Sequence, residues 1–328
     1  MPDFSHILTA IVSLTFFSIV LSALGCVIAF HQRGGGNLRD FLGYVFPKDL
    51  ITRRSCHLDV GFILLKQLLR PWLAAPLLLL TSAKCAVMTY GLLVLAFGPR
   101  AQSAMSVALF AGLLIAAVLI QDFLRFESHR WMHRIGVLWD VHKVHHSAEF
   151  LTPLTNHRVH LVEEVIQQGV TGLSVGPLLG IAAFVTATSV STTTLLGFDA
   201  YMLIDTLCFA MLRHSHIGLC FGPLERYLMS PRQHHLHHSV DTRHWDKNFG
   251  FLFSCWDRTA GTICYSDPKE VVNIGISAEE ARDYSSVLKL YFMPYIKLYR
   301  RCLPRSKRRR SVLVEPSLDL RIGPLSKI

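Results

Sequence analysis

Histidines dominate the part of the sequence that could carry chemistry. The 328-residue chain has 17 histidines, and fourteen of them fall between His129 and His244. Three clusters combine histidines at spacings of three or four residues. They are HxxxH at His129 and His133, HxxHH at His142, His145 and His146, and a second HxxHH at His234, His237 and His238.

These spacings favour metal binding over a set of solvated side chains. Residues three or four apart lie on one face of a helix, so each cluster can direct its imidazoles toward a common point. Imidazole is a good ligand for iron, zinc, copper or nickel. Without metal, so many close rings would have unpaired buried nitrogens or repelling charges. Eight ligands exceed the needs of one ion, so we expect two metals, which suits a two-electron oxidation.

The elements that must position these clusters are expected to be membrane helices. Apolar residues make up 51% of the chain and charged residues 17%, whereas soluble proteins usually have about 25% charged residues. Residues 7–30 form an apolar stretch without a convincing cleavage pattern, so we expect a retained transmembrane helix. Two helical hairpins are predicted at 72–97 with 105–120 and at 170–190 with 195–212. The expected fold is an all-α polytopic bundle with about four to six spanning or re-entrant helices.

The basic residues predict the orientation of this bundle. The formal net charge is +10, and many basic residues lie in 300–310 and in the polar segment 31–59, which is expected to be a loop. Basic residues flank membrane segments on the cytoplasmic side. We therefore expect an integral membrane protein whose residues 121–169 and 213–328 form a cytoplasmic helical cap with the metal site. No nucleic-acid partner is predicted, because the basic tail follows a stretch rich in Leu, Tyr and Phe.

The residues around the histidines resemble the fatty acid hydroxylase superfamily, also called the sterol desaturase family. The family pattern runs HRxxH, LWxxHxxHHS, RxHxxE, a His-Ser pair, PxxHxxHH, NxG and WDxxxGT, and this chain follows it in order over about residues 105–265. The matching segments are His129 to His133, Leu138 to Ser147, Arg158 with His160 and Glu163, His214-Ser215, Pro231 to His238, Asn248 to Gly250, and Trp256-Asp257 with Gly261-Thr262. Leu161 stands where the family usually has proline, and His216 where asparagine is common.

The resemblance implies a di-iron enzyme that uses dioxygen to hydroxylate or desaturate a sterol, fatty acyl or related lipid. The implied metal ligands are His129, His133, His142, His145, His146, His214, His234, His237 and His238, with His160 as a further candidate, and the eight histidines of the three clusters are the implied catalytic residues. His157, His216 and His235 rank below them. Carboxylates available to orient the rings are Asp122, Glu127, Asp140, Glu163, Asp241 and Asp257, and the sequence does not pair them.

The chain has no GxGxxG, flavin or haem-attachment motif, so the two electrons must come from a separate donor, which family analogy suggests is cytochrome b5, ferredoxin or a related reductase. Its eight cysteines are scattered and indicate neither a disulfide framework nor a zinc ribbon. We expect membrane helices and a cytoplasmic loop in 1–104, the catalytic domain in 105–265, and in 266–328 an interfacial amphipathic helix, around 284–303, with a basic tail.

Three other classes of protein are weighed against the oxidase. A histidine-rich membrane metal transporter or metal-binding protein would place its ligands near the middle of spanning helices, whereas these clusters flank the apolar stretches. A hydrolase with zinc-bound water usually needs about three protein ligands per ion, fewer than are present. A scaffold without activity is disfavoured because the ligand set looks complete.

Overall fold

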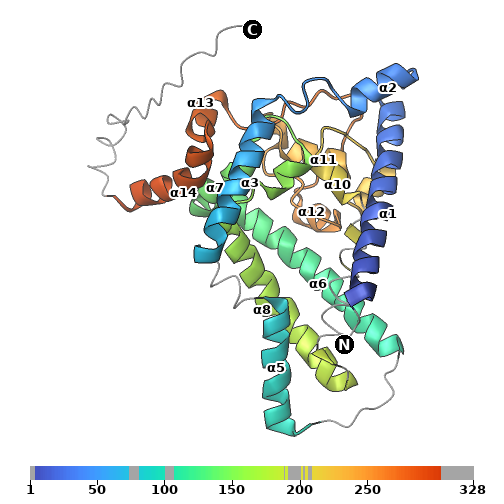
Figure 1. Ribbon diagram of the computed structural model, residues 1–328, viewed down its shortest axis with the longest axis vertical. Helices are drawn as coiled ribbons and strands as arrows, with labels where there is room; N and C mark the ends of the chain where they lie inside the picture. The colour runs from blue at the N-terminus through green and yellow to red at the C-terminus, as the bar shows by residue number, and fades with distance from the viewer. Residues whose placement is uncertain are drawn as a thin grey trace.

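The computed structural model describes residues 4–73, 81–99, 107–187, 189–190, 201, 204–205 and 209–303. Within these residues the regular elements are all helices, and the extended pairings are two isolated bridges, Leu228 with Phe253 and Ser239 with Ile274. The expected all-α fold is confirmed. In Figure 1 the helices of residues 82–97, 107–134 and 161–186 extend into the lower part, while short helices with their connecting loops gather in the upper part.

The helices follow one another in this order: α1 (Phe4–Gln32), α2 (Leu38–Val45), α3 (Arg54–Leu73), α5 (Ser82–Phe97), α6 (Val107–Arg134), α7 (Gly136–His146), η1 (Pro153–His157), α8 (Leu161–Thr186), α10 (Ala210–Arg213), η2 (Gly222–Arg226), α11 (Pro231–His237), η3 (Thr242–His244), α12 (Cys255–Ala260), α13 (Ala278–Ala281), η4 (Arg282–Tyr284) and α14 (Val287–Cys302).

Helices α5 and α8 pack closely in the lower part of the molecule (Figure 1). A Cβ atom built on Gly176 would lie 2.5 Å from Cβ of Cys85, and one on Gly180 would lie 2.5 Å from the carbonyl oxygen of Ala86. Glycine is required at both positions because only the absence of a side chain lets the two backbones approach this closely. Helix α6 joins the pair through a small apolar cluster of Ala86, Ala117, Val175 and Leu179.

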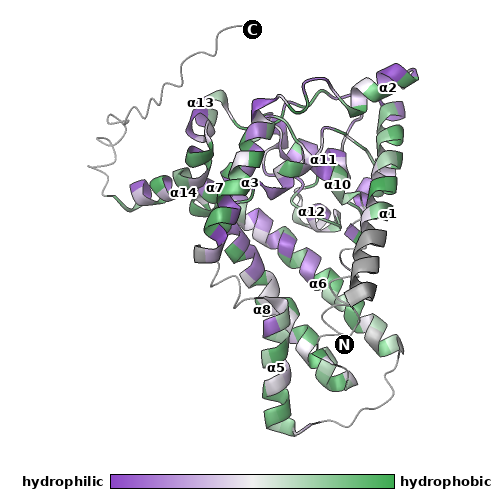
Figure 2. Cartoon of the chain, in the orientation of Figure 1, coloured by the Kyte–Doolittle hydropathy of each residue, from purple (hydrophilic) through white to green (hydrophobic). Residues whose placement is uncertain are grey.

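Two described helices are long and apolar enough to cross a membrane. They are Thr15–Gln32 of α1 and Leu161–Thr186 of α8, and Ser82–Phe97 of α5 is apolar but shorter. Figure 2 shows hydrophobic residues concentrated along the lower helices and hydrophilic ones in the upper part. These features suggest a membrane protein and support the expected polytopic bundle only in part. Most of the predicted span at 195–212 lies outside the described residues.

The segment 31–59 is not the continuous loop that the sequence predicts, because it contains α2 and the start of α3. Helix α2 begins with a capping box in which the Asn37 side chain accepts from the backbone N–H of Asp40 and the Asp40 carboxylate accepts from that of Asn37. Helix α3 buries Phe62 on one face and exposes Leu64 on another. A search for continuous apolar runs misses such helices since their polar residues interrupt the run.

Helix α14 lies within the range 284–303, where the sequence predicts an interfacial amphipathic helix, but one of its faces contacts the protein. Leu290, Tyr291 and Met293 are buried there in a cluster with Phe62 of α3 and Val144 of α7. Three of its basic residues also contact the protein. Lys289 donates to the carbonyl of Arg282, Lys297 pairs with Asp283, and Arg301 pairs with Asp140. The exposed apolar residues are Leu288, Phe292, Tyr295, Ile296, Leu298 and Tyr299.

The buried Arg158 joins three parts of the upper region. Its Nε donates to Asp59 of α3 at 2.5 Å, Nη2 to the Ser55 carbonyl at 2.9 Å, and Nη1 to Ser147, just after α7, at 3.3 Å. Arg158 and Asp59 both have 0% exposure. The Asp59 carboxylate also accepts from the Thr155 hydroxyl at 2.8 Å. Since each buried charge has the other as its ion-pair partner, the pair fixes α3 against the segment that leads into α8.

Replacing Arg158 should therefore destabilise the fold. Arg158→Met leaves the Asp59 carboxylate buried without its cation, so we expect a loss of about 3–5 kcal/mol in the free energy of unfolding. Arg243→Met is the matched control because Arg243 is exposed beside Asp241 and Glu270 and should change little. The measurement is the unfolding midpoint of each purified variant in detergent. Equal midpoints for the two variants would show that the buried pair does not hold the fold.

Candidate metal centre

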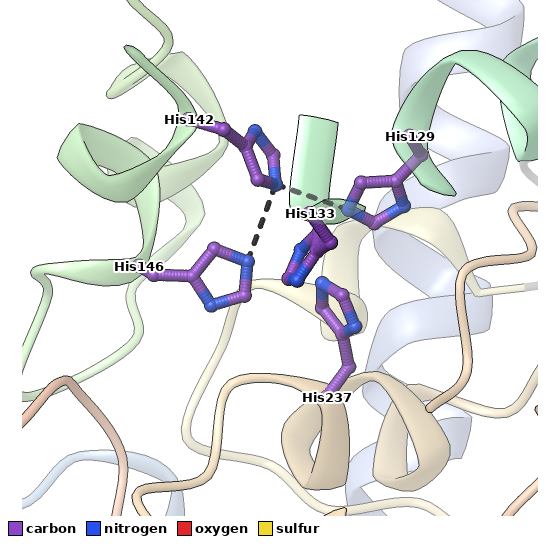
Figure 3. A group of neighbouring side chains, drawn as sticks. All are labelled: His129, His133, His142, His146 and His237. Atoms are coloured by element: carbon purple, nitrogen blue, oxygen red, sulfur yellow. Dashed lines mark hydrogen bonds between the residues drawn. The ribbon is translucent and has the colours of Figure 1, made fainter. Parts of the chain in front are cut away.

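The structure gathers nine of the ten predicted ligand histidines into two adjacent groups. The first contains His129, His133, His142, His146 and His237, and the second contains His145, His214, His234 and His238. Within each group the candidate ligand atoms all lie within 4.8 Å of one another. Figure 3 shows the rings of the first group pointing inward from three helices toward a common centre.

The last turns of α6, the helix α7, the end of α10 and the helix α11 supply these side chains. Each HxxHH motif divides its ligands, which differs from the common point expected for each cluster. His142 and His146 join the first group and His145 the second, while His234 and His238 join the second group and His237 the first. Because both motifs cross from one group to the other, the groups are in contact. The rings of His146 and His238 stack with centroids 4.3 Å apart.

All nine imidazoles are buried, which keeps them in the neutral form that can bind a metal. Burial lowers the pKa of His129, His142 and His145 to about 3. Burial, followed by repulsion from neighbouring groups, also lowers the pKa of the other six well below the usual value for histidine. A neutral imidazole has one N–H and one nitrogen lone pair, so the position of its proton decides which nitrogen can be a ligand.

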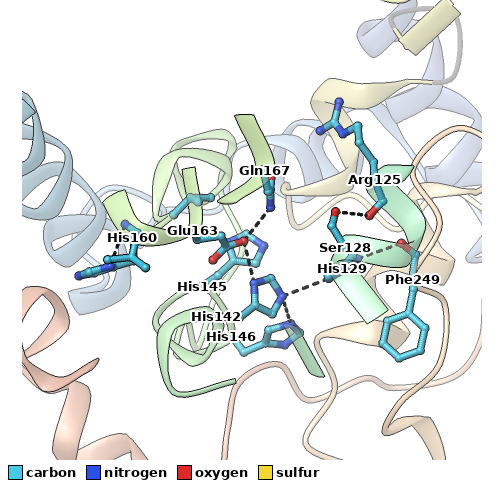
Figure 4. A network of polar contacts seen from close by, with 12 residues as sticks. Arg125, Ser128, His129, His142, His145, His146, His160, Glu163, Gln167 and Phe249 are labelled. Atoms are coloured by element: carbon cyan, nitrogen blue, oxygen red, sulfur yellow. Dashed lines mark hydrogen bonds and ion pairs between the residues drawn. The ribbon is translucent and has the colours of Figure 1, made fainter. Parts of the chain in front are cut away.

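In three rings of the first group, a hydrogen-bond acceptor beside Nδ1 fixes the proton on that nitrogen. His129 Nδ1 lies 2.9 Å from the Phe249 carbonyl, His142 Nδ1 2.8 Å from Glu163, and His237 Nδ1 2.8 Å from the Lys247 carbonyl. Each acceptor requires a proton on Nδ1, which leaves the lone pair on Nε2. Figure 4 shows Glu163 and Phe249 holding His142 and His129 in this way.

The resulting lone pairs face one another, and this arrangement fits bound cations. Nε2 of His129 lies 3.1 Å from Nε2 of His142, although neither atom has a proton to donate, and Nε2 of His133 and of His237 has no hydrogen-bond partner. In the second group, Nε2 atoms approach within 3.0 Å, 2.9 Å and 3.2 Å along the series His145, His214, His234 and His238. Single protons cannot satisfy so many nitrogens, whereas a metal ion in each group would accept all the lone pairs.

A loop after α11 provides two of the backbone acceptors, and its own polar contacts hold it in place. The Asn248 side chain donates to the carbonyls of Gln233 at 3.0 Å and Cys264 at 2.9 Å. The Asp257 carboxylate accepts from the backbone N–H groups of Phe249 at 2.9 Å and Gly250 at 2.7 Å. These contacts give the NxG and WDxxxGT motifs a physical role, because they position the carbonyls of residues 247 and 249 that orient two rings.

The α6 helix is attached to the same region through Asp122, which is fully buried. Its carboxylate accepts from the backbone of Leu252 at 2.9 Å and Phe253 at 3.1 Å, and from the Trp256 indole at 2.9 Å. Of the six carboxylates considered in the sequence, Glu163 is the one that hydrogen-bonds directly to a ligand ring. The remaining three form ion pairs elsewhere: Glu127 with Arg130, Asp140 with Arg301, and Asp241 with Arg243.

His160 lies outside both groups, and we leave it out of the proposed ligand set. It caps α8 by accepting from the Val162 N–H at 3.3 Å, and its Nε2 donates to the Tyr291 carbonyl at 2.9 Å. Both ring nitrogens therefore have partners other than a metal. His157, His216 and His235 are also outside the two groups.

A cavity of about 270 Å³ reaches the first group from the protein surface. His133, His146 and His237 form one wall. The other walls include Trp139, Trp245, Val240 and Ile276, together with Asp246 and Glu280. This cavity gives a small group or part of a larger molecule access to the first histidine group.

The fold and the site define a helical protein with two neighbouring histidine groups, each of which could hold a metal ion. Residues 114–262 match the family model described as fatty acid hydroxylase. These residues, slightly less than half of the chain, therefore resemble the fatty acid hydroxylase superfamily, in agreement with the motifs.

Among curated proteins, the chain is similar to the alkylglycerol monooxygenase of Caenorhabditis elegans, at 28% identity over 45% of this chain and 26% of the relative. The alkylglycerol monooxygenase of Danio rerio is 29% identical over 48% of this chain and 32% of the relative. The ornithine lipid hydroxylase OlsE of Rhizobium tropici is 24% identical over 53% of this chain and 49% of the relative. The chain thus spans at most about half the length of these relatives. No solved structure matches it.

Removing the charge of Glu163 should weaken metal binding at the first group. In Glu163→Gln the neutral amide holds the Nδ1 proton of His142 less strongly, so we expect metal affinity to fall about 10-fold to 100-fold. Glu164→Gln is the matched control, because Glu164 pairs with Lys66 and with no ligand ring. The measurement is metal content after dialysis against increasing chelator concentrations. If both variants lose metal at the same chelator concentration, Glu163 does not orient the ligand.

Proposed function

We propose that this protein is a membrane-bound lipid hydroxylase with a di-iron centre and dioxygen as co-substrate. The observation that carries the proposal is the pair of adjacent, buried groups of five and four neutral histidines. The family assignment and the names of the relatives, which are a monooxygenase and a lipid hydroxylase, support it. We propose a related activity for this chain, which covers only part of each relative.

The donor set supports iron in particular. Imidazole binds several divalent metals, but zinc has no accessible redox change and its catalytic sites usually use about three protein ligands. Oxidation of an alkyl C–H bond requires a redox-active metal, and a bound iron pair would supply the oxidising chemistry with dioxygen. Iron commonly takes about six ligands, so five and four nitrogen ligands would leave room at each ion for a further ligand.

Hydroxylation inserts one oxygen atom of dioxygen into a C–H bond and releases the other as water. The reaction consumes two electrons and two protons, so it requires an external reductant. Since the sequence contains no recognisable flavin, haem or dinucleotide motif, we propose a separate electron-donor protein of the cytochrome b5 or ferredoxin class, acting on the cytoplasmic side.

The protein's own residues contribute positioning and the exclusion of water. Glu163 and the carbonyls of residues 247 and 249 orient three rings of the first group. The cavity beside this group has indole walls from Trp139 and Trp245 and aliphatic walls from Val240 and Ile276. Such surfaces suit an alkyl chain, and we propose that the oxidised carbon of the lipid is held there.

The position of the histidines supports an oxidase over a metal transporter. A transporter would have its ligands near the middle of spanning helices. The nine histidines lie on α6 beyond its apolar part, on α7, and on residues 214–238. None falls within the two candidate spans among the described residues, Thr15–Gln32 and Leu161–Thr186.

Elemental analysis of protein purified from iron-supplemented cells tests the metal assignment. We expect about two iron ions per chain, one for each histidine group, and a loss of most of this iron in the double variant His145→Ala with His237→Ala. His57→Ala is the control because His57 is exposed on α3, away from both groups. Bound zinc in place of iron, or iron content unchanged in the double variant, would contradict the proposal.

Filling the cavity should separate substrate access from metal binding. Val240→Trp places an indole where we propose the lipid chain lies, so turnover of a lipid substrate should fall about 10-fold or more, while iron content remains that of the wild type. Val137→Trp is the control, because Val137 is exposed on α7 and is not part of this cavity. Wild-type turnover by Val240→Trp would show that the substrate approaches by another route.

A further inference from the structure

A second cavity, of about 350 Å³, lies against α11 and is lined by basic side chains. Arg33 follows α1, Arg53 precedes α3, and Arg232 lies in the first turn of α11. His216 and His235 also line it, and these are two of the three histidines whose roles the sequence left open. Neither the metal centre nor the proposed reaction uses this cavity.

The charges facing the cavity are predominantly positive. Glu149 and Glu270 are the acidic residues in its wall, but the Glu270 carboxylate lies 3.3 Å from Arg243 and 3.4 Å from His244. The Arg232 guanidinium donates a hydrogen bond to the backbone carbonyl of Glu270 and not to its carboxylate. Arg53 pairs with Asp49 at 2.7 Å and stacks on the Phe150 ring at 4.0 Å. Three guanidinium groups therefore line this space. Of the two carboxylates in its wall, that of Glu270 already has partners outside the cavity, which leaves that of Glu149.

Buried polar atoms in this wall have no hydrogen-bond partner in the protein. Arg232 is 8% exposed and His235 is 3% exposed, yet Nε of Arg232 and Nε2 of His235 have none. Nε of Arg53 and Nδ1 of His216 also have no hydrogen-bond partner. Buried polar groups are normally hydrogen-bonded, so these unpaired atoms belong to a wall whose polar groups the protein alone does not satisfy. Guanidinium groups match the oxygen atoms of a phosphate in geometry and charge.

The cavity lies beside the end of a candidate membrane span. The apolar part of α1 ends at Gln32, and Arg33 in the cavity wall is the next residue. The Gln32 side chain donates to the Cys220 carbonyl at 2.8 Å and accepts from the Cys220 N–H at 3.0 Å, which fixes this end of α1 to the cap. On α2, Leu38 and Leu42 are exposed apolar residues, which suits a helix at a lipid surface. A phosphate in this position would come from a lipid headgroup.

We propose that this cavity binds the phosphate of an anionic phospholipid, with Arg232 and Arg53 as its principal contacts. The bound headgroup would connect the end of α1 with α11, the helix that supplies three of the histidines of the metal centre. The proposal does not depend on the chemistry of that centre, because it rests on the charge, burial and unpaired atoms of the cavity. It concerns a structural lipid rather than the molecule that is oxidised.

Lipid binding to the purified full-length protein in detergent tests the proposal by native mass spectrometry. The probes are phosphatidylglycerol, phosphatidylcholine and inorganic phosphate. We expect phosphatidylglycerol to bind in preference to phosphatidylcholine, and its Kd to rise about 10-fold or more in Arg232→Gln and in Arg53→Gln. Arg258→Gln loses the same charge from an exposed position on α12 outside the cavity wall, and should change the Kd less than about twofold.

Arg53→Gln provides a second test if Arg232→Gln does not fold. Arg53 is half-buried at the rim of the cavity, so its replacement should disturb the fold less. An equal loss of affinity in Arg258→Gln would overturn the proposal by showing that the attraction is a general effect of positive charge. Displacement of phosphatidylglycerol by an equimolar amount of inorganic phosphate would also overturn it, because the site would then recognise a free anion. Iron content measured on the same samples keeps the result separate from the proposed function.

Discussion

A neutral imidazole has a single proton, and the organisation of this protein follows from where those protons are placed. Three rings of the first group donate a hydrogen bond from Nδ1 to Glu163 or to the carbonyls of Lys247 and Phe249. Their Nε2 lone pairs then converge on a largely buried space. Two cations are the physical solution that the donor set fits, because each can accept several lone pairs at once.

The surrounding structure keeps the acceptors in place, and buried polar contacts do most of this positioning. Asp122 ties α6 to residues 252–256, while Asp257 and Asn248 hold the loop that contains the two acceptor carbonyls. At Gly250 a Cβ atom would lie 2.7 Å from the Phe253 carbonyl, so the loop cannot accept a larger residue without moving. Displacing this loop would change the orientation of His129 and His237 even though it contributes no ligand side chain.

The two cavities give the cap two different relations to lipid. One reaches His133, His146 and His237 and has aromatic and aliphatic walls, which suit the chain of a substrate. The other is basic and adjoins the end of α1, which suits a headgroup. Helix α11 borders both, because its ligand residues contribute to the metal centre while Arg232 and His235 face the basic cavity. The proposed substrate site and the proposed headgroup site therefore border the same short helix.

The sequence by itself predicted the helical fold class, the resemblance to the fatty acid hydroxylase family and the nine histidines that the structure brings together, because helix periodicity and motif order are local and can be read along the chain. It did not determine that each HxxHH motif divides between two metal groups, or that His160 caps α8. Only the tertiary structure decided which atoms orient the rings. The partner of His129 is a backbone carbonyl 120 residues away, and a carbonyl belongs to every residue type, so no pattern of side chains marks it. The loop 31–59 was mispredicted for a related reason, since α3 becomes a stable helix by packing its buried face against distant segments.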